Sequence, residues 1–206
     1  MVPTSSRMSL TGWEAGGTKF VLTRNLVVRG NFVHHNVGPA LWTDEGNVNT
    51  LYEGNLVEDN RDSGIFHEIS HSAVIRNNTL RRNGATAGNS FTSACILVAS
   101  SNDVEVYGNV VEDCRFGIHG SQQNRGPNQL ERLWVHDNTI RRAGEMFAGV
   151  VRDYGDSNQF FSRSLRFDRN RYEGTASQYP FAWQNGARTW DYWRSVGHDP
   201  SSTFID

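Results

Sequence analysis

Short stretches in which apolar and polar residues alternate recur along the chain. Four clear examples are Leu26–Arg29, Ala73–Arg76, Val104–Tyr107 and Leu133–His136. They are brief, rich in β-branched residues and interrupted by Asn or Gly-Asn, which favours β-strands over helices. Because the side chains of a strand point alternately to its two faces, each stretch predicts a strand with one buried face.

The strands recur in register with three sets of equivalent residues. The first set is asparagine, at Asn31, Asn55, Asn78, Asn109, Asn138 and Asn170. The second follows five residues later in the first four repeats, at Asn36, Asn60, Asn83 and Cys114. The third is a small residue, at Gly17, Ala40, Gly64, Cys95, Gly117 and Gly149. The shortest spacing is 23 residues, and we place the extra residues of later repeats in loops near Gly84–Thr92, Gln122–Gln129 and Tyr154–Arg163.

Repeats of this length, with three short strands and three turns each, predict an all-β fold, a right-handed parallel β-helix with coils of about 23 residues. Asn suits the turns because it tolerates left-handed backbone angles, and stacked Asn amides can pair along a column. A β-sandwich would need hairpins, and the sequence lacks their two-residue turn signals. We assign residues 1–174 to the β-helix and residues 175–206 to a C-terminal cap.

The cap has its own sequence features. Thr189 and Gly197 are the start and stop signals of a short helix, and its several Trp residues would cover the apolar end of the last coil. The repeat is already under way near residue 14, so we expect further coils, and any secretion signal, upstream of this sequence.

Composition narrows the classes of partner. Only 37% of the 206 residues are hydrophobic, which suits a narrow core lined by every second residue. The net charge of -2 and pI near 6.4 give no basic patch for nucleic acid, and no apolar run is long enough for a bilayer. We therefore expect no nucleic-acid partner, no membrane partner and a monomer. Cys95 and Cys114 fall in different columns, so we expect two buried free thiols.

Two copies of one pattern place acidic residues on neighbouring coils. Ala40–Asp44 and Gly64–Glu68 each run small, apolar, aromatic, any, acidic. The apolar second residue faces the core, so the aromatic and acidic residues face outward. Stacked strands lie about 4.8 Å apart, which puts the carboxyl groups of Asp44 and Glu68 at roughly 5 Å. Such a pair titrates as a coupled unit in which one carboxyl group keeps its proton near neutrality.

That separation matches the two carboxyl groups of a retaining glycosidase. Glu68, beside Phe66, is the expected acid/base, and Asp44, in a more polar setting, is the expected nucleophile. Trp42 and Phe66 would form an apolar platform for a sugar ring. The alternative is an incidental pair of solvated acids, or one that binds a cation.

Further residues are candidates for substrate contacts. They are Lys19, Glu14, His119, Gln122, Gln123 and Asp153. Lys19 falls one repeat before Trp42 and would lie beside Asp44. Gln122 and Gln123 fit turn positions better than ligand positions, although a sugar hydroxyl group could reach them. His67 points inward, as a core residue. No spacing of His, Cys and acidic residues fits zinc or calcium, so we expect neither a metal nor another cofactor.

The segments Glu14–Phe20, Ala40–Ser70 and Thr189–Arg194 resemble those of bacterial right-handed parallel β-helix repeat proteins of the pectate-lyase-like superfamily. Leu41–Asp44 and Phe66–Glu68 resemble the two catalytic segments of the glycoside hydrolase family 120 β-xylosidases. The resemblance implies a carbohydrate-active protein that acts on an extracellular or cell-surface polysaccharide or oligosaccharide. A polysaccharide lyase or epimerase, which would need Lys19, Arg125 or Arg152 to neutralise a uronate, and a non-catalytic glycan-binding or structural β-helix remain the alternatives.

Overall fold

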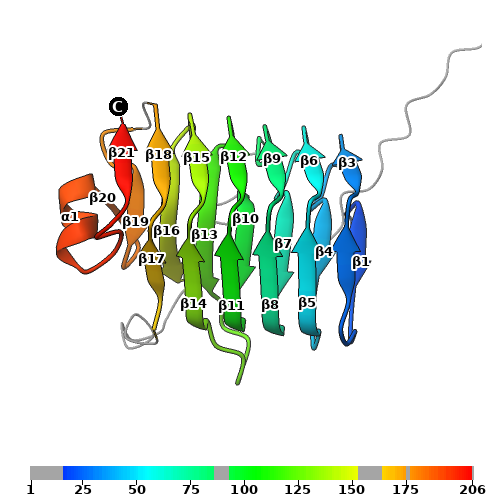
Figure 1. The fold of residues 1–206 in the computed structure, drawn as a ribbon. Coiled ribbons are helices and arrows are strands. Elements are labelled where there is room, and N and C mark those ends of the chain that lie inside the picture. Colours follow the sequence, from blue (N-terminus) through cyan, green and yellow to red (C-terminus); the bar gives the residue numbers. More distant parts are fainter. Residues whose placement is uncertain (1–15, 86–92, 153–163, 175–176, 206) are drawn as a thin grey trace, which may run out of the picture.

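The chain winds into successive coils, of which the first six that the structure describes contribute one strand to each of three sheets and the last adds strands to two of them (Figure 1). The structure is a computed structural model that describes residues 16–85, 93–152, 164–174 and 177–205. Every pairing between coils is parallel, and the order of strands in each sheet follows the order of coils. The predicted parallel β-helix is therefore confirmed.

Three sheets, here called A, B and C, form the walls. Sheet A contains β1 (Thr18–Phe20), β4 (Leu41–Thr43), β7 (Ile65–Glu68), β10 (Ala94–Ala99), β13 (Phe116–Gln122), β16 (Met146–Arg152), β19 (Phe181–Trp183) and the antiparallel β20 (Gly186–Arg188). Sheet B contains β2 (Val27–Arg29), β5 (Val48–Glu53), β8 (His71–Arg76), β11 (Asn102–Tyr107), β14 (Glu131–His136) and β17 (Arg166–Asp168). Sheet C contains β3 (Phe32–His34), β6 (Leu56–Glu58), β9 (Thr79–Arg81), β12 (Val110–Glu112), β15 (Thr139–Arg141), β18 (Arg171–Glu173) and β21 (Thr203–Ile205).

The turn between sheets B and C carries an asparagine ladder, formed by Asn31, Asn55, Asn78, Asn109, Asn138 and Asn170. Each Asn donates its backbone N–H and its side-chain Nδ2 to Oδ1 of the next Asn, with N···O distances of 2.9–3.1 Å. The five Asn residues after Asn31 are buried. The ladder thus satisfies backbone and side-chain groups that burial would otherwise leave unpaired.

The reason for Asn at these positions differs from the one expected. The left-handed residue of each turn is the one before the ladder Asn, as at Gly54 (φ +62°), Asn77 (φ +54°) and Gly108 (φ +64°). The ladder residues themselves have no positive φ. Asn is needed in this column for its amide, which both donates and accepts, and not for its backbone tolerance.

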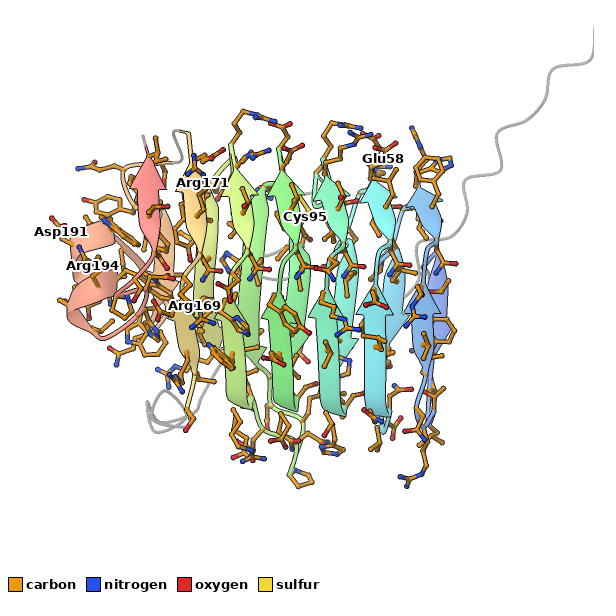
Figure 2. The ribbon with its side chains drawn as sticks, in the orientation of Figure 1. Glu58, Cys95, Arg169, Arg171, Asp191 and Arg194 are labelled. Atoms are coloured by element: carbon orange, nitrogen blue, oxygen red, sulfur yellow. A yellow bond between two sulfur atoms is a disulfide. The ribbon has the colours of Figure 1, made fainter. Side chains whose placement is uncertain are left out.

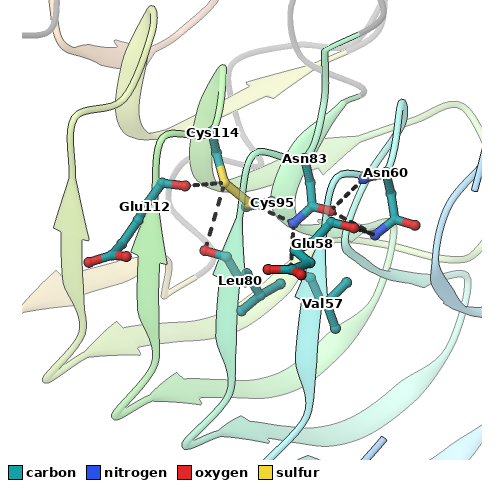
Figure 3. Close-up of a disulfide and its surroundings, with 8 residues drawn as sticks. All are labelled: Val57, Glu58, Asn60, Leu80, Asn83, Cys95, Glu112 and Cys114. Carbon is teal, nitrogen blue, oxygen red and sulfur yellow. Dashed lines mark hydrogen bonds between the residues drawn. A yellow bond between two sulfur atoms is a disulfide. The ribbon is translucent and has the colours of Figure 1, made fainter. Parts of the chain in front are cut away.

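A second column joins sheets C and A. Asn36 donates to Asn60, and Asn60 donates to Asn83, in the same way as in the asparagine ladder. Where the next Asn would stand, Cys114 forms a disulfide with Cys95, and Asn83 Nδ2 lies 3.3 Å from Cys95 Sγ (Figure 3). The expectation of two free thiols is therefore wrong. The two columns meet across adjacent coils, with the Cα atoms 6.0 Å apart, which is a normal distance for a bridge.

Charged side chains on the outside alternate in sign from coil to coil. Along sheet C, one register line runs through Glu58, Arg81, Glu112, Arg141 and Glu173. The turn beside it pairs Arg82 with Asp59 and Arg142 with Asp113, each through two nitrogens. Glu58, in the second described coil, and Arg171, in the penultimate strand of sheet C, lie along this side of the molecule (Figure 2). Opposite charges therefore stack along this side of the molecule.

The fifth repeat has a different register from the expected one. Gly149 pairs with His119, and Val150 pairs with Gly120, so both lie two residues further along than the small-residue column predicts. Val150 still points inward and is buried, because a shift of two residues keeps a side chain on the same face. The shift puts Val151 in the column of Glu68, where Asp153 was expected.

The C-terminal residues close the last coil. Helix α1 (Trp190–Ser195) begins after Thr189, whose side chain accepts from the N–H of Tyr192, and the chain turns at Gly197 (φ +95°). Trp193 is fully buried and stacks on Phe181 at 5.1 Å. Strands β19 and β21 add to sheets A and C, so this segment also continues the coil (Figure 1). Among the described residues, no helix has the length and apolarity to cross a bilayer.

The asparagine ladder should contribute strongly to stability in its middle. Asn78→Ala removes the acceptor for Asn55 and the donor to Asn109 and to the Tyr52 carbonyl. We expect a loss of about 2–4 kcal/mol in the free energy of unfolding, because the partners stay buried. Asn31→Ala, at the exposed first position of the ladder, should cost less than about 1 kcal/mol. Urea denaturation measures both, and equal losses would contradict this role.

The disulfide predicts the thiol content of the protein. Without reductant, the unfolded chain should show no free thiol, and after reduction it should show two. The Cys95→Ala/Cys114→Ala variant should lose about 2–4 kcal/mol of stability, because the bridge closes a loop across 19 residues of sequence. Two reactive thiols in the freshly unfolded, unreduced protein would show that the bridge is absent.

Candidate functional site

The two acidic residues of the repeated pattern lie on adjacent coils, where sheet A turns toward sheet B. Trp42 pairs with Phe66 and Thr43 with His67, so Asp44 and Glu68 follow at equivalent positions. Neighbouring strands of a sheet lie about 4.8 Å apart. Both side chains line one cleft of about 430 Å³, together with Lys19, Val21, Trp42, Glu45, Ile69 and Arg125.

Asp44 is held by the only lysine of the chain. Lys19 Nζ lies 2.9 Å from Asp44 Oδ2 and 4.1 Å from the centre of the Trp42 ring. Lys19 reaches this place because it pairs with Trp42 in the register, as the 23-residue spacing predicts. The ion pair is partly shielded from water, since both side chains are mostly covered.

Glu68 has a different environment. Glu68 is only 4% exposed. Its carboxyl oxygens accept hydrogen bonds from Trp42 Nε1 at 3.3 Å and from Arg125 Nη2 at 3.4 Å. Burial, and next the negative charge of Asp44, raise the pKa of Glu68 from 4.5 to about 7, against the opposing influence of Arg125, Trp42 and Lys19. At neutral pH, this carboxyl group can therefore either give or take a proton.

Trp42 does not form the open platform that the sequence predicts. It points away from the core but is only 5% exposed, because Lys19 lies over the ring and Phe66 stacks with it at 5.6 Å. Its indole N–H is directed at Glu68. Trp42 thus orients the carboxyl group, and of the two aromatic residues only Phe66 retains intermediate exposure.

Gln122 is the last residue of β13, and Gln123 begins the loop between β13 and β14. Gln122 is buried, and its amide binds the backbone of Gln123, Asn128 and Leu130, so it holds the loop together and does not line the cleft. Gln123 Oε1 accepts from Arg125 Nε at 3.2 Å. Sequence reasoning considered Arg125 only as a cation for a uronate and missed its contact with Glu68, which depends on how the loop folds back.

The structure does not bring His119 to the cleft. It lies in the outward column of sheet A, aligned with Leu97, but it is completely buried. An apolar cluster on this outer face contains Leu97 and Phe116, and the ring of Phe116 meets His119 edge-on at 5.5 Å. Burial lowers the pKa of His119 to about 3, so it is neutral at physiological pH.

His67 points into the core, as expected. Its Nδ1 lies 2.7 Å from Thr43 Oγ1, which also contacts the hydroxyl group of Tyr52 at 2.7 Å. Its Nε2 is buried without a hydrogen-bond partner among the described residues. Burial lowers the pKa of His67 to about 3, so the ring is a neutral core group.

Two candidate residues, Glu14 and Asp153, lie outside the described residues, as do most of the Gly84–Thr92 and Tyr154–Arg163 loops. Within the part of the chain that the structure describes, no group of three or more His, Cys, Asp or Glu residues is arranged to hold a metal ion.

The burial of Glu68 predicts a pH-dependent difference in stability. Below pH 4 the carboxyl group is neutral in both folded and unfolded chains; between pH 4.5 and about 7 it ionises in the unfolded chain first, which lowers the stability of the native protein. The free energy of unfolding of Glu68→Gln, relative to that of wild type, should therefore be about 1–3 kcal/mol higher at pH 8 than at pH 4. Urea denaturation at both pH values tests this, with Asp191→Asn, which removes an exposed carboxyl group, as control. A pH-independent difference would contradict the environment described for Glu68.

Comparison with known proteins agrees with the architecture. A family model described as "right handed beta helix region" matches residues 4–111, just over half of the chain. No curated protein and no solved structure matches the sequence. Membership of this family is compatible with a carbohydrate-active protein or with a structural one. With the sheets and their parallel register described above, the match shows that the chain belongs to the right-handed β-helix family.

Proposed function

We propose that the protein is a retaining glycoside hydrolase that uses Asp44 as nucleophile and Glu68 as acid/base. The observation that carries the proposal is the stacking of two acidic residues in one cleft, where one is paired with Lys19 and the other has a pKa raised to about 7. Along sheet C, by contrast, charges stack with alternating sign. A purely structural surface has no need for a like-charged pair at this spacing, because it costs repulsion.

In the first step, a carboxylate oxygen of Asp44 attacks the anomeric carbon and the glycosidic C–O bond breaks. Glu68 donates its proton to the leaving oxygen, which departs as an alcohol. In the second step, Glu68 takes a proton from water, the resulting hydroxide attacks the anomeric carbon, and the bond to Asp44 breaks. The two inversions leave the product with the configuration of the substrate.

The environments of the two acids suit these roles. A group that must give a proton in one step and take one in the next works best with a pKa near the operating pH, as Glu68 has. The spacing of about 4.8 Å between coils fits the roughly 5–5.5 Å of retaining enzymes and is too short for the extra water of an inverting one. The positive charge of Lys19 stabilises a carboxylate nucleophile at Asp44.

The substrate class follows from the resemblance of Leu41–Asp44 and Phe66–Glu68 to β-xylosidase segments, so β-xylosides are the first to test. We propose that the natural substrate is a polysaccharide or oligosaccharide outside the cytoplasm. The disulfide between Cys95 and Cys114 supports such a location, since disulfides persist mainly in oxidising compartments.

The test is hydrolysis of aryl β-glycosides, beginning with the xyloside, with the configuration of the first product read by proton NMR. Wild type should release the sugar with retained configuration. In Glu68→Gln, kcat/KM, which reports formation of the glycosyl intermediate, should fall by about 10²–10⁴-fold for substrates with poor leaving groups and far less for activated aryl glycosides, because only the former need the acid in that step. Asp44→Asn should lose activity on both kinds, while Asp103→Asn, which removes a surface partner of Arg132, should keep wild-type activity.

Other results would point to the alternatives. Unsaturated uronate absorbance without hydrolysis would indicate a lyase. Equal binding of a glycan by wild type, Asp44→Asn and Glu68→Gln without any turnover would indicate a binding module. An inverted product, or equal losses of kcat/KM in Glu68→Gln for good and poor leaving groups, would contradict the assigned roles.

A further inference from the structure

The loop between β13 and β14 is locked at both ends. The buried amide of Gln122 accepts from Leu130 N at 2.7 Å and donates to the carbonyl oxygens of Gln123 and Asn128 at 2.7 and 3.4 Å. Leu130 is itself fully buried. Ser100, on the preceding coil, exchanges hydrogen bonds with the backbone of Gln123. The loop is thus a fixed part of the wall.

The tip of this loop directs Arg125 at the cleft. Residues 125–128 form a tight turn, in which Gly126 has a φ of +62° and Asn128 N donates to the Arg125 carbonyl at 3.3 Å. Gln123 accepts from Arg125 Nε, which fixes the plane of the guanidinium group. Arg125 Nη2 thus reaches Glu68 Oε1, although the loop follows β13, which lies two coils after β7 and its Glu68.

Other charged groups face Glu68 as well. Asp44 and Glu45 come from the preceding coil, and Lys19 from the coil before it. Lys19 is engaged by Asp44 at 2.9 Å, whereas Arg125 contacts Glu68 directly. Arg125 is therefore the cation that contacts Glu68 itself, and it is held in place by a loop that the coils of β7 and β10 lack.

We propose that Arg125 is a positioning residue whose contact with Glu68 stabilises the carboxylate form, so that the same carboxyl group can act first as acid and then as base. Burial alone would favour the neutral acid, which can donate a proton but cannot accept one in the second step. The guanidinium group offsets this by stabilising the carboxylate. The kinetic part of the inference rests on the proposed function, whereas the effect on the titration of Glu68 does not.

The test begins with the free protein. Carboxyl ¹³C NMR of glutamate-labelled protein, with the Glu68 signal assigned from Glu68→Gln, gives the titration of this residue without any substrate. Arg125→Gln should raise the midpoint by about one pH unit, and Arg125→Lys, which keeps the charge but loses the planar fork, should raise it less. Arg132→Gln removes an arginine from the next strand, where it pairs with Asp103, and should leave the midpoint unchanged.

Turnover gives the second readout. In Arg125→Gln, the dependence of turnover on pH should shift to higher pH together with the titration midpoint of Glu68. Hydrolysis of the glycosyl intermediate should slow roughly tenfold at pH 6, because in fewer molecules is Glu68 ionised and able to act as a base. Arg125→Lys should restore most of this rate.

The outcomes separate the two proposals. An unchanged Glu68 midpoint in Arg125→Gln, or an equal shift in Arg132→Gln, would overturn the role of Arg125. Retained hydrolysis with an unmoved pH profile would also overturn it and leave the proposed function intact. A shifted midpoint in a protein that hydrolyses no glycoside would uphold the action of Arg125 on Glu68 and reject the glycosidase.

Discussion

The asparagine ladder is the interaction on which the rest of the structure depends. Each ladder Asn binds the next one through both its backbone N–H and its side-chain amide, so neighbouring coils are fixed in a single register. A slip by one residue would break these bonds and turn every core side chain of the coil outward. The ladder ends at Asp199, whose buried carboxyl group accepts from Asn170, Tyr172 and Trp193 and so ties the cap to the coils.

This fixed register also determines what the surface can do. Residues at equivalent positions must lie one strand spacing apart, whether or not they attract each other. Along sheet C the chain meets this constraint by alternating the sign of its charges, as from Glu58 to Arg81 to Glu112. At the ends of β4 and β7 in sheet A, the chain places Asp44 beside Glu68 and gives each acid its own cation, Lys19 for Asp44 and Arg125 for Glu68. The scaffold therefore supplies a carboxyl pair whose spacing does not depend on flexible loops.

The features that could be predicted from sequence are those that repeat. The equivalent Asn residues predicted the coils and the ladder. Counting back one repeat from Trp42 correctly predicted that Lys19 lies beside it. Prediction failed where a contact depends on a part of the chain that does not repeat. The loop after β13 brings Arg125 to Glu68, an outer apolar cluster buries His119, and the disulfide joins two columns that the repeat treats as separate.

The assignment of Asp44 as nucleophile is the central chemical claim, and trapping of the covalent intermediate tests it most directly. A 2-deoxy-2-fluoro glycoside with a good leaving group slows the hydrolysis of the intermediate more than its formation, so the labelled protein accumulates. Peptide mass spectrometry should then find one sugar per chain, attached to Asp44, and no label in Asp44→Asn. A label on Glu68, or turnover of the parent glycoside with inversion and no labelled peptide, would contradict the mechanism.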